Sequence, residues 1–304
     1  MLDAQDSLRN NVILITGAAR GQGAAHAELL AHRGAAVVMF DAPDTPIPSA
    51  KYSMASTDQL HAMCDKIRSA GGRALAVEGD VRRQEDLDQA VEAAVAEFGH
   101  LDGLIANAGI WGEIVSIWEM SEGAWNDTVD INLSGCWRSV KAVVPKMREH
   151  GQGSIVLVSS VMGFGEGMAK GSSYSAAKFG VMGLMHAAAL ELGPENIRVN
   201  AVCPGFIDTD MHRWQDSMDY MAGRPGGTEE DLTQAGRYYA NLAGRGPLDP
   251  LDVARSAAFL LSAEAANLTG VALPVDAGHT ILPRVNQNPT PLKTVGPQSQ
   301  ETGR

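Results

Sequence analysis

Tyr174 and Lys178 stand four residues apart and could together carry proton-transfer chemistry. An apolar pattern with spacings of three and four predicts a helix from about residue 174 to residue 192, ending before Gly193-Pro194. On a helix the phenol and the ammonium share one face. The cation is expected to lower the tyrosine pKa from its resting value of about 10, so that the phenol exchanges a proton with an alcohol or carbonyl oxygen near neutral pH. A solvated surface contact without chemistry is the more common explanation for such a pair alone.

A glycine-rich turn near the start of the chain is a candidate cofactor site. The apolar run 11–16 predicts a strand, and a helical pattern begins at about residue 24. Glycines between a strand and a helix let the backbone approach a pyrophosphate, which the helix N-terminus stabilises. The spacing is G-x3-G-x-G rather than the general G-x-G-x-x-G, so an ordinary glycine turn remains an alternative. The candidate contacts in this turn are Gly17, Arg20, Gly21, Gln22 and Gly23.

Asp41 is the candidate that selects the cofactor. It ends a second buried strand, predicted at 35–40, and lies about twenty residues beyond the glycines. A carboxylate there can bind the adenosine ribose hydroxyls and would repel a 2′-phosphate, which favours NAD over NADP. Arg20 argues weakly in the other direction, because a guanidinium could accept a phosphate.

Strands and helices alternate along the rest of the chain. Further strands are predicted at 73–79, 101–106, 153–159, 197–202 and 271–275, and helices from near residue 57, at 84–98 and at 125–149. This alternation predicts a single-domain α/β fold with a Rossmann-type, doubly wound parallel sheet. Ligands of such sheets lie at the carboxyl ends of the strands. Candidate residues at those ends are Asp41, Asp80, Asn107, Ser160 and Pro204.

Composition excludes several classes of function. A net charge of -12 and a pI of about 5.1 argue against nucleic acid or an anionic membrane as a partner. The chain has no apolar run long enough for a membrane span, and its N-terminus lacks the pattern of a signal peptide. Its three widely spaced cysteines form no metal pattern and indicate free thiols in a reducing cytoplasm. His212 and His279 have no second ligand at a usable spacing, so no metal site is expected.

Over residues 8–282 the chain resembles the short-chain dehydrogenase/reductase family. The motifs that carry the resemblance are Thr16-Gly17-x3-Gly21-x-Gly23, Asn107-Ala108-Gly109, Asp130-Ile131-Asn132-Leu133, Ser160, Tyr174-x3-Lys178, and Pro204-Gly205 with Thr209. One departure is visible, since thirteen residues separate Ser160 from Tyr174, one more than usual in the family. We expect the loop 163–171 to absorb the extra residue.

The resemblance implies a reaction and a set of site residues. Hydride would pass between a secondary alcohol or its ketone and NAD, with Tyr174 as the acid–base and Lys178 lowering its pKa and binding the nicotinamide ribose. Ser160 would hold the substrate oxygen, and Asn132 would hold a water that links Lys178 to solvent. The cofactor contacts implied beyond the glycine turn and Asp41 are Asp80, Val81, Asn107, Ala108, Gly109, Tyr174, Lys178, Pro204, Gly205, Ile207 and Thr209.

The segment 42–56 is longer than its counterpart in most of the family and contains three prolines. With the glycine turn and His26-Ala27, it resembles the mycofactocin-associated branch, which includes carveol dehydrogenases. That resemblance implies a lid over a tightly held NAD that an external redox acceptor would recycle. A surface insertion without function remains the alternative.

The segment 206–246 is expected to cover the substrate as a mobile lid. Its methionines and aromatic residues, with Trp111 and Trp118, suit an apolar or cyclic alcohol, although packing against a neighbouring subunit would explain them as well. The lid residues in question are Met211, Trp214, Met218, Tyr220, Met221, Tyr238 and Tyr239. The family also implies a homotetramer formed through the helices at 125–149 and 174–192. The proline-rich tail 283–304 is expected to be disordered or to cross a neighbour.

The sequence therefore predicts an NAD-dependent secondary alcohol dehydrogenase. One alternative is an NADPH-dependent ketoreductase of biosynthesis, which Asp41 opposes. Another is a dinucleotide-binding protein without turnover, which the presence of all four catalytic candidates opposes.

Overall fold

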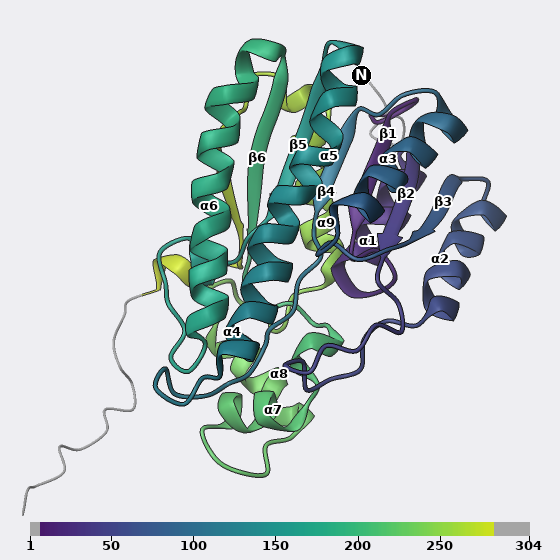
Figure 1. Cartoon of the computed structure of the whole chain (residues 1–304). Coiled ribbons are helices and arrows are strands. Elements are labelled where there is room, and N and C mark those ends of the chain that lie inside the picture. Colours follow the sequence, from purple (N-terminus) through teal and green to yellow (C-terminus); the bar gives the residue numbers. More distant parts are fainter. Residues whose placement is uncertain (1–6, 283–304) are drawn as a thin grey trace, which may run out of the picture.

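The computed structural model describes residues 7–282 and forms one α/β unit around a seven-stranded sheet (Figure 1). The strands are β1 (Val12–Thr16), β2 (Ala36–Asp41), β3 (Arg73–Glu78), β4 (Gly103–Ala106), β5 (Gly153–Val158), β6 (Ile197–Pro204) and β7 (Ala272–Val275). Their order is β3-β2-β1-β4-β5-β6-β7, and every neighbouring pair is parallel. The order reverses between β1 and β4, which is the point where doubly wound sheets bind ligands. The predicted fold class is confirmed.

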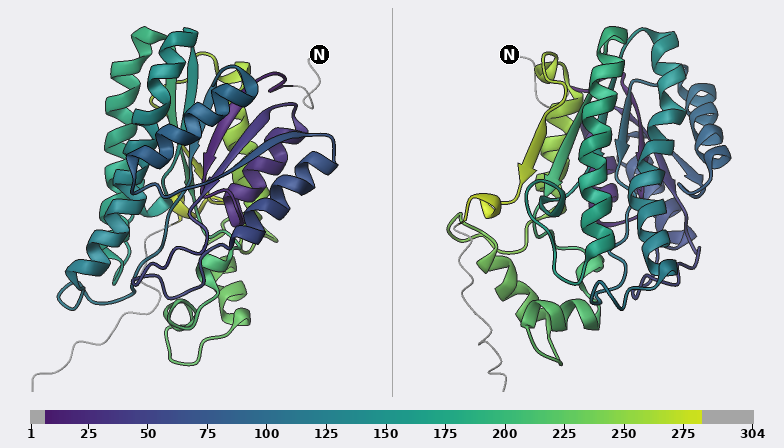
Figure 2. Two further views of the ribbon diagram at one scale, coloured as in Figure 1. Left: turned by 45° about the vertical axis from the view of Figure 1, so that its right-hand side comes forward. Right: turned by 60° about the vertical axis from the view of Figure 1, so that its left-hand side comes forward.

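Helices cover both faces of the sheet (Figure 2). They are α1 (Gly21–His32), α2 (Thr57–Ser69), α3 (Gln84–Phe98), α4 (Glu122–Val129), α5 (Gly135–His150), α6 (Ser172–Leu192), α7 (Gln215–Ala222), α8 (Glu229–Tyr238) and α9 (Pro250–Leu261). One buried cluster joins α3, α5 and α6 to the sheet, and another joins α1, α2 and α9 to its other face. Because both faces are covered, β1 reads as a continuous apolar run rather than an alternating one.

The helix predicted as one element at 125–149 differs from the structure in two respects. It begins at Glu122, capped by the side chain of Ser121, and a π-helical segment at Asp130–Ser134 separates α4 from α5. Inside this segment the Asn132 amide accepts from the Ile110 N–H and donates to the Ile110 carbonyl, both at 2.8 Å. The π segment thus fastens the chain that follows β4, which simple periodicity does not reveal.

The other predicted elements agree with the structure to within about two residues at each end, apart from α1, which begins at Gly21 rather than at about residue 24. The predicted helix 84–98 coincides with α3, and α6 begins two residues earlier than predicted. Helix α9 lies outside the predicted elements, and the tail 283–304 lies outside the described residues. Within residues 7–282, no helix has the length and apolar character needed to cross a bilayer.

Candidate active site

A cavity of about 240 Å³ lies at the carboxyl ends of the strands. It is lined by the β1–α1 turn, the segments after β2 to β6, the insertion 42–56 and part of 206–246. Every predicted site residue lines it except Asn132, which is buried and bonded to Ile110. Those lining residues are Gly17, Arg20, Gly21, Gln22, Gly23, Asp41, Asp80, Val81, Asn107, Ala108, Gly109, Ser160, Tyr174, Lys178, Pro204, Gly205, Ile207 and Thr209.

The glycines of the β1–α1 turn are required by close backbone packing. A Cβ on Gly23 would lie 1.9 Å from the Gly17 carbonyl oxygen, and one on Gly17 would lie 2.8 Å from the Ala108 Cα. Gly17 and Gly21 also have positive φ angles, +68° and +55°, which favour glycine. The turn therefore leaves its backbone at the cavity wall, where a dinucleotide pyrophosphate could approach it.

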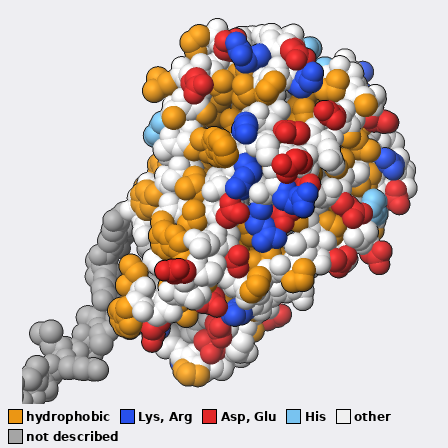
Figure 3. Space-filling model, in the orientation of Figure 1, with side chains coloured by type: hydrophobic (Ala, Val, Ile, Leu, Met, Phe, Trp, Pro, Cys, Tyr) orange, Lys and Arg blue, Asp and Glu red, His pale blue; other side chains and the backbone are white. Residues whose placement is uncertain are grey.

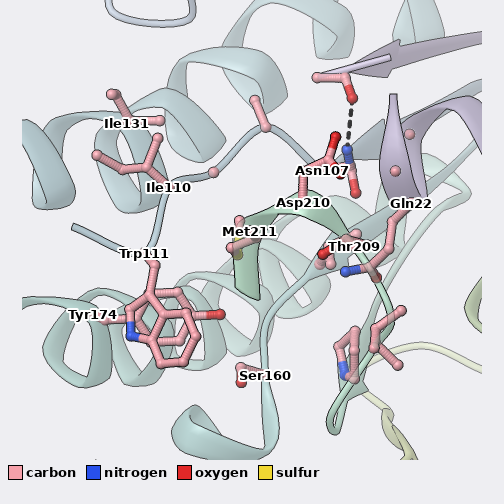
Figure 4. A pocket seen from close by; sticks show the side chains of 18 of the residues that line it. Gln22, Asn107, Ile110, Trp111, Ile131, Ser160, Tyr174, Thr209, Asp210 and Met211 are labelled. Carbon is pink, nitrogen blue, oxygen red and sulfur yellow. Dashed lines mark hydrogen bonds between the residues drawn. The ribbon is translucent and has the colours of Figure 1, made fainter. Parts of the chain in front are cut away.

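Asn107 ties the end of β4 to the glycine turn. Its side-chain amide donates to the carbonyls of Thr16 at 2.9 Å and Gly17 at 3.1 Å. The Thr16 hydroxyl in turn accepts the N–H groups of Asn107 and Ala108. These bonds hold the two strand ends together at the point where the strand order reverses (Figure 4).

Asp41 is fixed by the backbone around it. Its carboxylate accepts the Ala19 N–H at 2.8 Å and the Ala42 N–H at 2.9 Å. Burial raises the pKa of Asp41, and the two N–H bonds and the Arg20 charge oppose that rise. The Arg20 guanidinium itself donates to the Ser53 carbonyl, pairs with Asp210 at 3.4 Å and lies 5.9 Å from the centre of the Tyr52 ring. Arg20 is thus engaged by protein groups rather than left for a phosphate.

Asp80, after β3, lies on the same side of the cavity. It binds the Arg82 guanidinium with contacts of 2.6 to 3.1 Å. Burial acts to raise the Asp80 pKa, but the hydrogen bonds and charge of Arg82 outweigh it and hold the pKa below the usual value. Asp80 is therefore an ionised acceptor at neutral pH.

Tyr174 and Ser160 lie in the other half of the cavity (Figure 4), which Lys178 also lines. The Lys178 ammonium donates to the Val158 carbonyl at 2.8 Å and lies 5.6 Å from the centre of the Tyr174 ring. Burial lowers the Lys178 pKa to about 8, so the side chain is still mostly protonated at pH 7. The Ser160 hydroxyl accepts the Met162 N–H at 3.2 Å.

The expected lowering of the Tyr174 pKa is wrong for these residues alone. Burial raises the pKa of Tyr174, and its hydrogen bond with Ser160 opposes the rise. The expectation considered the neighbouring cation and omitted the cost of placing a phenolate in a buried position. The Lys178 ammonium, 5.6 Å from the centre of the Tyr174 ring, does not offset the cost of burial.

Asn132 lies beside the lysine without reaching into the cavity. A Cβ built on Gly109 would be 3.2 Å from the Asn132 Oδ1 and 3.7 Å from the Lys178 Nζ, so both side chains flank Gly109. The Asn132 amide is engaged by Ile110 at both ends. Its side chain therefore positions the wall behind the lysine, and its oxygen and nitrogen each keep one further hydrogen-bonding position.

Apolar and aromatic side chains form an aromatic wall in the same cavity as Ser160. Trp111 lies 6.5 Å from Tyr174 and 4.6 Å from His212 between ring centres, and Phe206 lies 4.5 Å from His212. Burial lowers the His212 pKa to about 3, so this imidazole is neutral. The remaining members of the wall are Met162, Met168, Met211, Tyr220, Met221, Tyr239 and His279.

Only some of the residues predicted to contact the substrate line the cavity. Met211, Tyr220, Met221, Tyr239 and Trp111 line the cavity. Trp214, Met218, Tyr238 and Trp118 do not line it. The Trp118 prediction is wrong because the side chain is 82% exposed in the segment before α4.

The insertion 42–56 forms part of the cavity wall through Thr45, Ile47, Tyr52, Met54 and Ala55. The Tyr52 hydroxyl accepts the Trp111 N–H at 3.2 Å, and Lys51 pairs with Glu113 at 3.2 Å. With the Arg20 bond to Ser53, these contacts fasten the insertion to both the glycine turn and the segment after β4.

Phe206, His212 and Met168 are cavity residues whose role there sequence reasoning missed. Phe206 directly follows Pro204-Gly205, so its position was available as a signal. Met168 belongs to the loop that contains the extra residue, where Val115 donates to the Lys170 carbonyl at 3.0 Å. No local pattern marks His212, because only the fold brings it against Trp111.

Comparison with known proteins identifies relatives that cover nearly the whole chain. The family model for short chain dehydrogenase matches residues 11–219. The (-)-trans-carveol dehydrogenase of Rhodococcus erythropolis is 39% identical, over 90% of this chain and 99% of its own. The cis-4-hydroxycyclohexanecarboxylate dehydrogenase of Sinomonas cyclohexanicum is 38% identical, over 90% and 98%. The crystal structure of carveol dehydrogenase from Mycobacterium avium in complex with NAD matches with a TM-score of 0.87 and 36% identity, over 91% and 99%.

Proposed function

The chain belongs to the short chain dehydrogenase family, and from this premise we propose that it oxidises an uncharged cyclic secondary alcohol to its ketone with NAD. The observation that carries the proposal is a single cavity with two unlike halves. Ser160, Tyr174 and Lys178 meet an aromatic wall in one half, and Asp41 lies in the half lined by the glycine turn. Bound NAD would supply the acceptor for the hydride.

The residues of this chain would hold the alcohol and move its proton. The Ser160 hydroxyl would bind the alcohol oxygen and orient it toward Tyr174, which would take the hydroxyl proton as general base. Lys178 would supply a positive charge at the base of the site, and Asn132 would keep the Ile110 wall in place. Asp41 would bind the adenosine ribose, and the glycine turn would bind the pyrophosphate through backbone N–H groups.

The proposed substrate is uncharged because the aromatic wall carries no group that would pair with an anion. Its residues are aromatic, methionine, neutral His212 or His279, and the His279 Nε2 is already engaged by the Glu166 carboxylate at 2.8 Å. Among the described residues, the one lysine or arginine in that half of the cavity is Lys178. Burying an unpaired carboxylate there would cost several kcal/mol. A carveol-like or cyclohexanol-like compound would fit this wall better than the hydroxycyclohexanecarboxylate named for one relative.

Steady-state kinetics with added NAD and an artificial electron acceptor, which would reoxidise any retained NADH, would test the proposal. We expect kcat/KM for carveol or cyclohexanol to exceed that for cis-4-hydroxycyclohexanecarboxylate by about 100-fold or more. Tyr174→Phe should lower kcat by about 100-fold or more, and NAD should still bind. Full activity of Tyr174→Phe, or preference for the carboxylate, would contradict the proposal.

The insertion 42–56 is proposed as a cover that retains NAD, as in the mycofactocin-associated branch with an external acceptor. Its attachment on both sides of the cavity supports this role. Purified, desalted protein would be denatured and its released NAD(H) and NADP(H) quantified. Near-stoichiometric NAD(H) is expected, with less from Tyr52→Phe, which lacks the acceptor for the Trp111 N–H. An empty wild-type protein that turns over added NAD would remove the retention proposal and leave the reaction standing.

The protein is further proposed to be a cytoplasmic homotetramer. Trp125, Trp137, Phe179 and Leu190 are 40%, 47%, 47% and 82% exposed on α4, α5 and α6, and apolar side chains gather on that side in Figure 3. The three free cysteines are buried, as a reducing compartment allows. Light scattering on Phe179→Glu should give a smaller species than the wild type, whereas an unchanged mass would place the interface elsewhere.

A further inference from the structure

A cluster of three side chains lies at the edge of the sheet opposite the cavity. His100 and Asp102 stand between α3 and β4, and His150 is the last residue of α5. In this fold the helices run against the strands, so helix C-termini and strand N-termini share that edge. It is the upper edge in Figure 1, far from α7 and α8. None of the three residues lines the cavity.

The two imidazoles converge on one carboxylate. The His100 Nε2 lies 3.0 Å from the Asp102 Oδ2, and the His150 Nε2 lies 3.1 Å from the Oδ1. The rings stack with their centres 5.1 Å apart and an angle of 25°. The donor atoms of all three residues lie within 4.8 Å of one another. Ligands bonded to one ion at about 2.0–2.2 Å stand at most about 4 Å apart, so small side-chain rotations would complete the set.

We propose that His100, Asp102 and His150 bind a divalent transition-metal ion of the Zn²⁺ class. Two imidazoles and one carboxylate are ligands that Zn²⁺ and its first-row neighbours prefer. The Asp102 side chain is 11% exposed, and those of His100 and His150 are 33% and 37% exposed. The ion would therefore reach a fixed carboxylate from solvent and keep an open position for water.

The surroundings of the cluster favour a cation. Asp102 is oriented by the Val12 N–H, which donates to its Oδ2 at 2.7 Å, as the outer partners of metal ligands often do. The negative C-terminal ends of α3 and α5 both point to this place, each followed by a glycine in the left-handed conformation, Gly99 and Gly151. The Asn10 carbonyl lies 3.2 Å from the His100 Nε2 and accepts its hydrogen bond when that nitrogen is protonated, so a bound ion would replace this proton.

A bound ion would connect the start of β4 to the end of α5. Because the three ligands adopt this arrangement only in the folded chain, binding would stabilise the fold by mass action. Distance from the cavity means that the ion would act on stability rather than on hydride transfer. Two histidines that only donate hydrogen bonds to Asp102 would show the same distances, and metal titration separates the two cases.

The test uses tag-free protein that has been treated with a chelator and then dialysed. We expect calorimetry to find one Zn²⁺ per chain with Kd of about 1 µM or lower. Saturating Zn²⁺ should raise the melting temperature by roughly 5 °C. His100→Gln and His150→Gln should each weaken binding by about tenfold or more. Glutamine can still donate to Asp102, so their melting temperatures without metal should match the wild type.

His61→Gln is the matched control. His61 pairs with a single carboxylate, Glu78, at 2.9 Å on the protein surface, and it should leave Zn²⁺ binding unchanged. Wild-type protein with no binding tighter than about 1 mM would overturn the proposal. Undiminished binding by His150→Gln would overturn it as well, because the ion would then use other residues.

Discussion

Asp41→Asn tests how the carboxylate after β2 selects the cofactor. Asp41 is held by the Ala19 and Ala42 N–H groups at 2.8 and 2.9 Å, which leaves further lone pairs at the cavity wall for ribose hydroxyls. A hydrogen bond to a charged group contributes about 1.5–3 kcal/mol. Repulsion between the carboxylate and a 2′-phosphate about 4 Å away is on the order of 4 kcal/mol at an effective dielectric constant of about 20.

Removing the charge weakens the hydrogen bonds to the ribose and removes the repulsion of the 2′-phosphate. Both changes lower the preference for NAD over NADP. We expect kcat/KM for NAD to fall by about tenfold or more, and kcat/KM for NADP to rise. The ratio of the two should fall by roughly 100-fold, which corresponds to about 3 kcal/mol of the combined effects. Arg20 does not replace this discrimination, because its guanidinium is engaged by Ser53, Asp210 and the Tyr52 ring.

The assay is initial-rate kinetics with both cofactors at saturating alcohol, on protein stripped of bound nucleotide. Asp44→Asn is the control, because Asp44 is an exposed carboxylate of the adjoining insertion 42–56 that accepts the Thr57 N–H at 3.0 Å and does not line the cavity. It should leave the ratio unchanged. A ratio that moves by less than about threefold in a folded Asp41→Asn protein would refute the assigned role.

Three further predictions concern titratable groups. Burial raises the Tyr174 pKa and the hydrogen bond with Ser160 opposes that rise, so kcat/KM for alcohol oxidation should increase with pH as Tyr174 loses its proton. Ser160→Ala should shift this increase to higher pH. A lower activity with an unshifted pH profile would contradict the effect of Ser160 on the Tyr174 pKa. Burial lowers the His26 pKa from 6.5 to about 3, so stability of up to about 5 kcal/mol is lost as pH falls from 6.5 toward 3. In an acid titration, His26→Leu should unfold at a lower pH than the wild type, whereas the exposed control His186→Gln should not. Equal unfolding midpoints for His26→Leu and the wild type would exclude the effect. Burial lowers the Lys178 pKa from 10.5 to about 8, so the cost of the buried charge is present below pH 8 and disappears toward pH 10.5. The melting temperature of inactive Lys178→Met, measured relative to the wild type, should therefore decline from pH 8 to pH 10.5. A difference in melting temperature that stays constant over this range would contradict the prediction.

The sequence alone predicts those parts of the fold that depend on local residue types and spacing. The apolar run at Val12–Thr16 is buried on both faces, so its composition alone indicates a central parallel strand. The glycine spacing likewise predicts the β1–α1 turn, because position 23 leaves no room for a Cβ and position 17 has a positive φ. Strand ends then placed Asp41, Asn107 and Ser160 along one edge, since parallel strands share their carboxyl ends.

Features that depend on contacts between distant segments were decided by the tertiary structure. The π segment around Asn132 follows from its bonds to Ile110, and Trp118 is exposed although its residue type suits a pocket. The Tyr174 pKa rises because burial is a property of the packed site and not of a spacing of four residues.

The same reason explains the partners that the sequence left unconnected. His212 contacts Trp111, about a hundred residues away in the chain. Asp102, which precedes β4, contacts His150 at the end of α5. Local periodicity carries information over a few turns or one strand, because its physical basis is which face of an element is buried. The proximity of side chains on different elements is created only when the elements pack, so the aromatic wall and the histidine cluster became visible only in the folded chain.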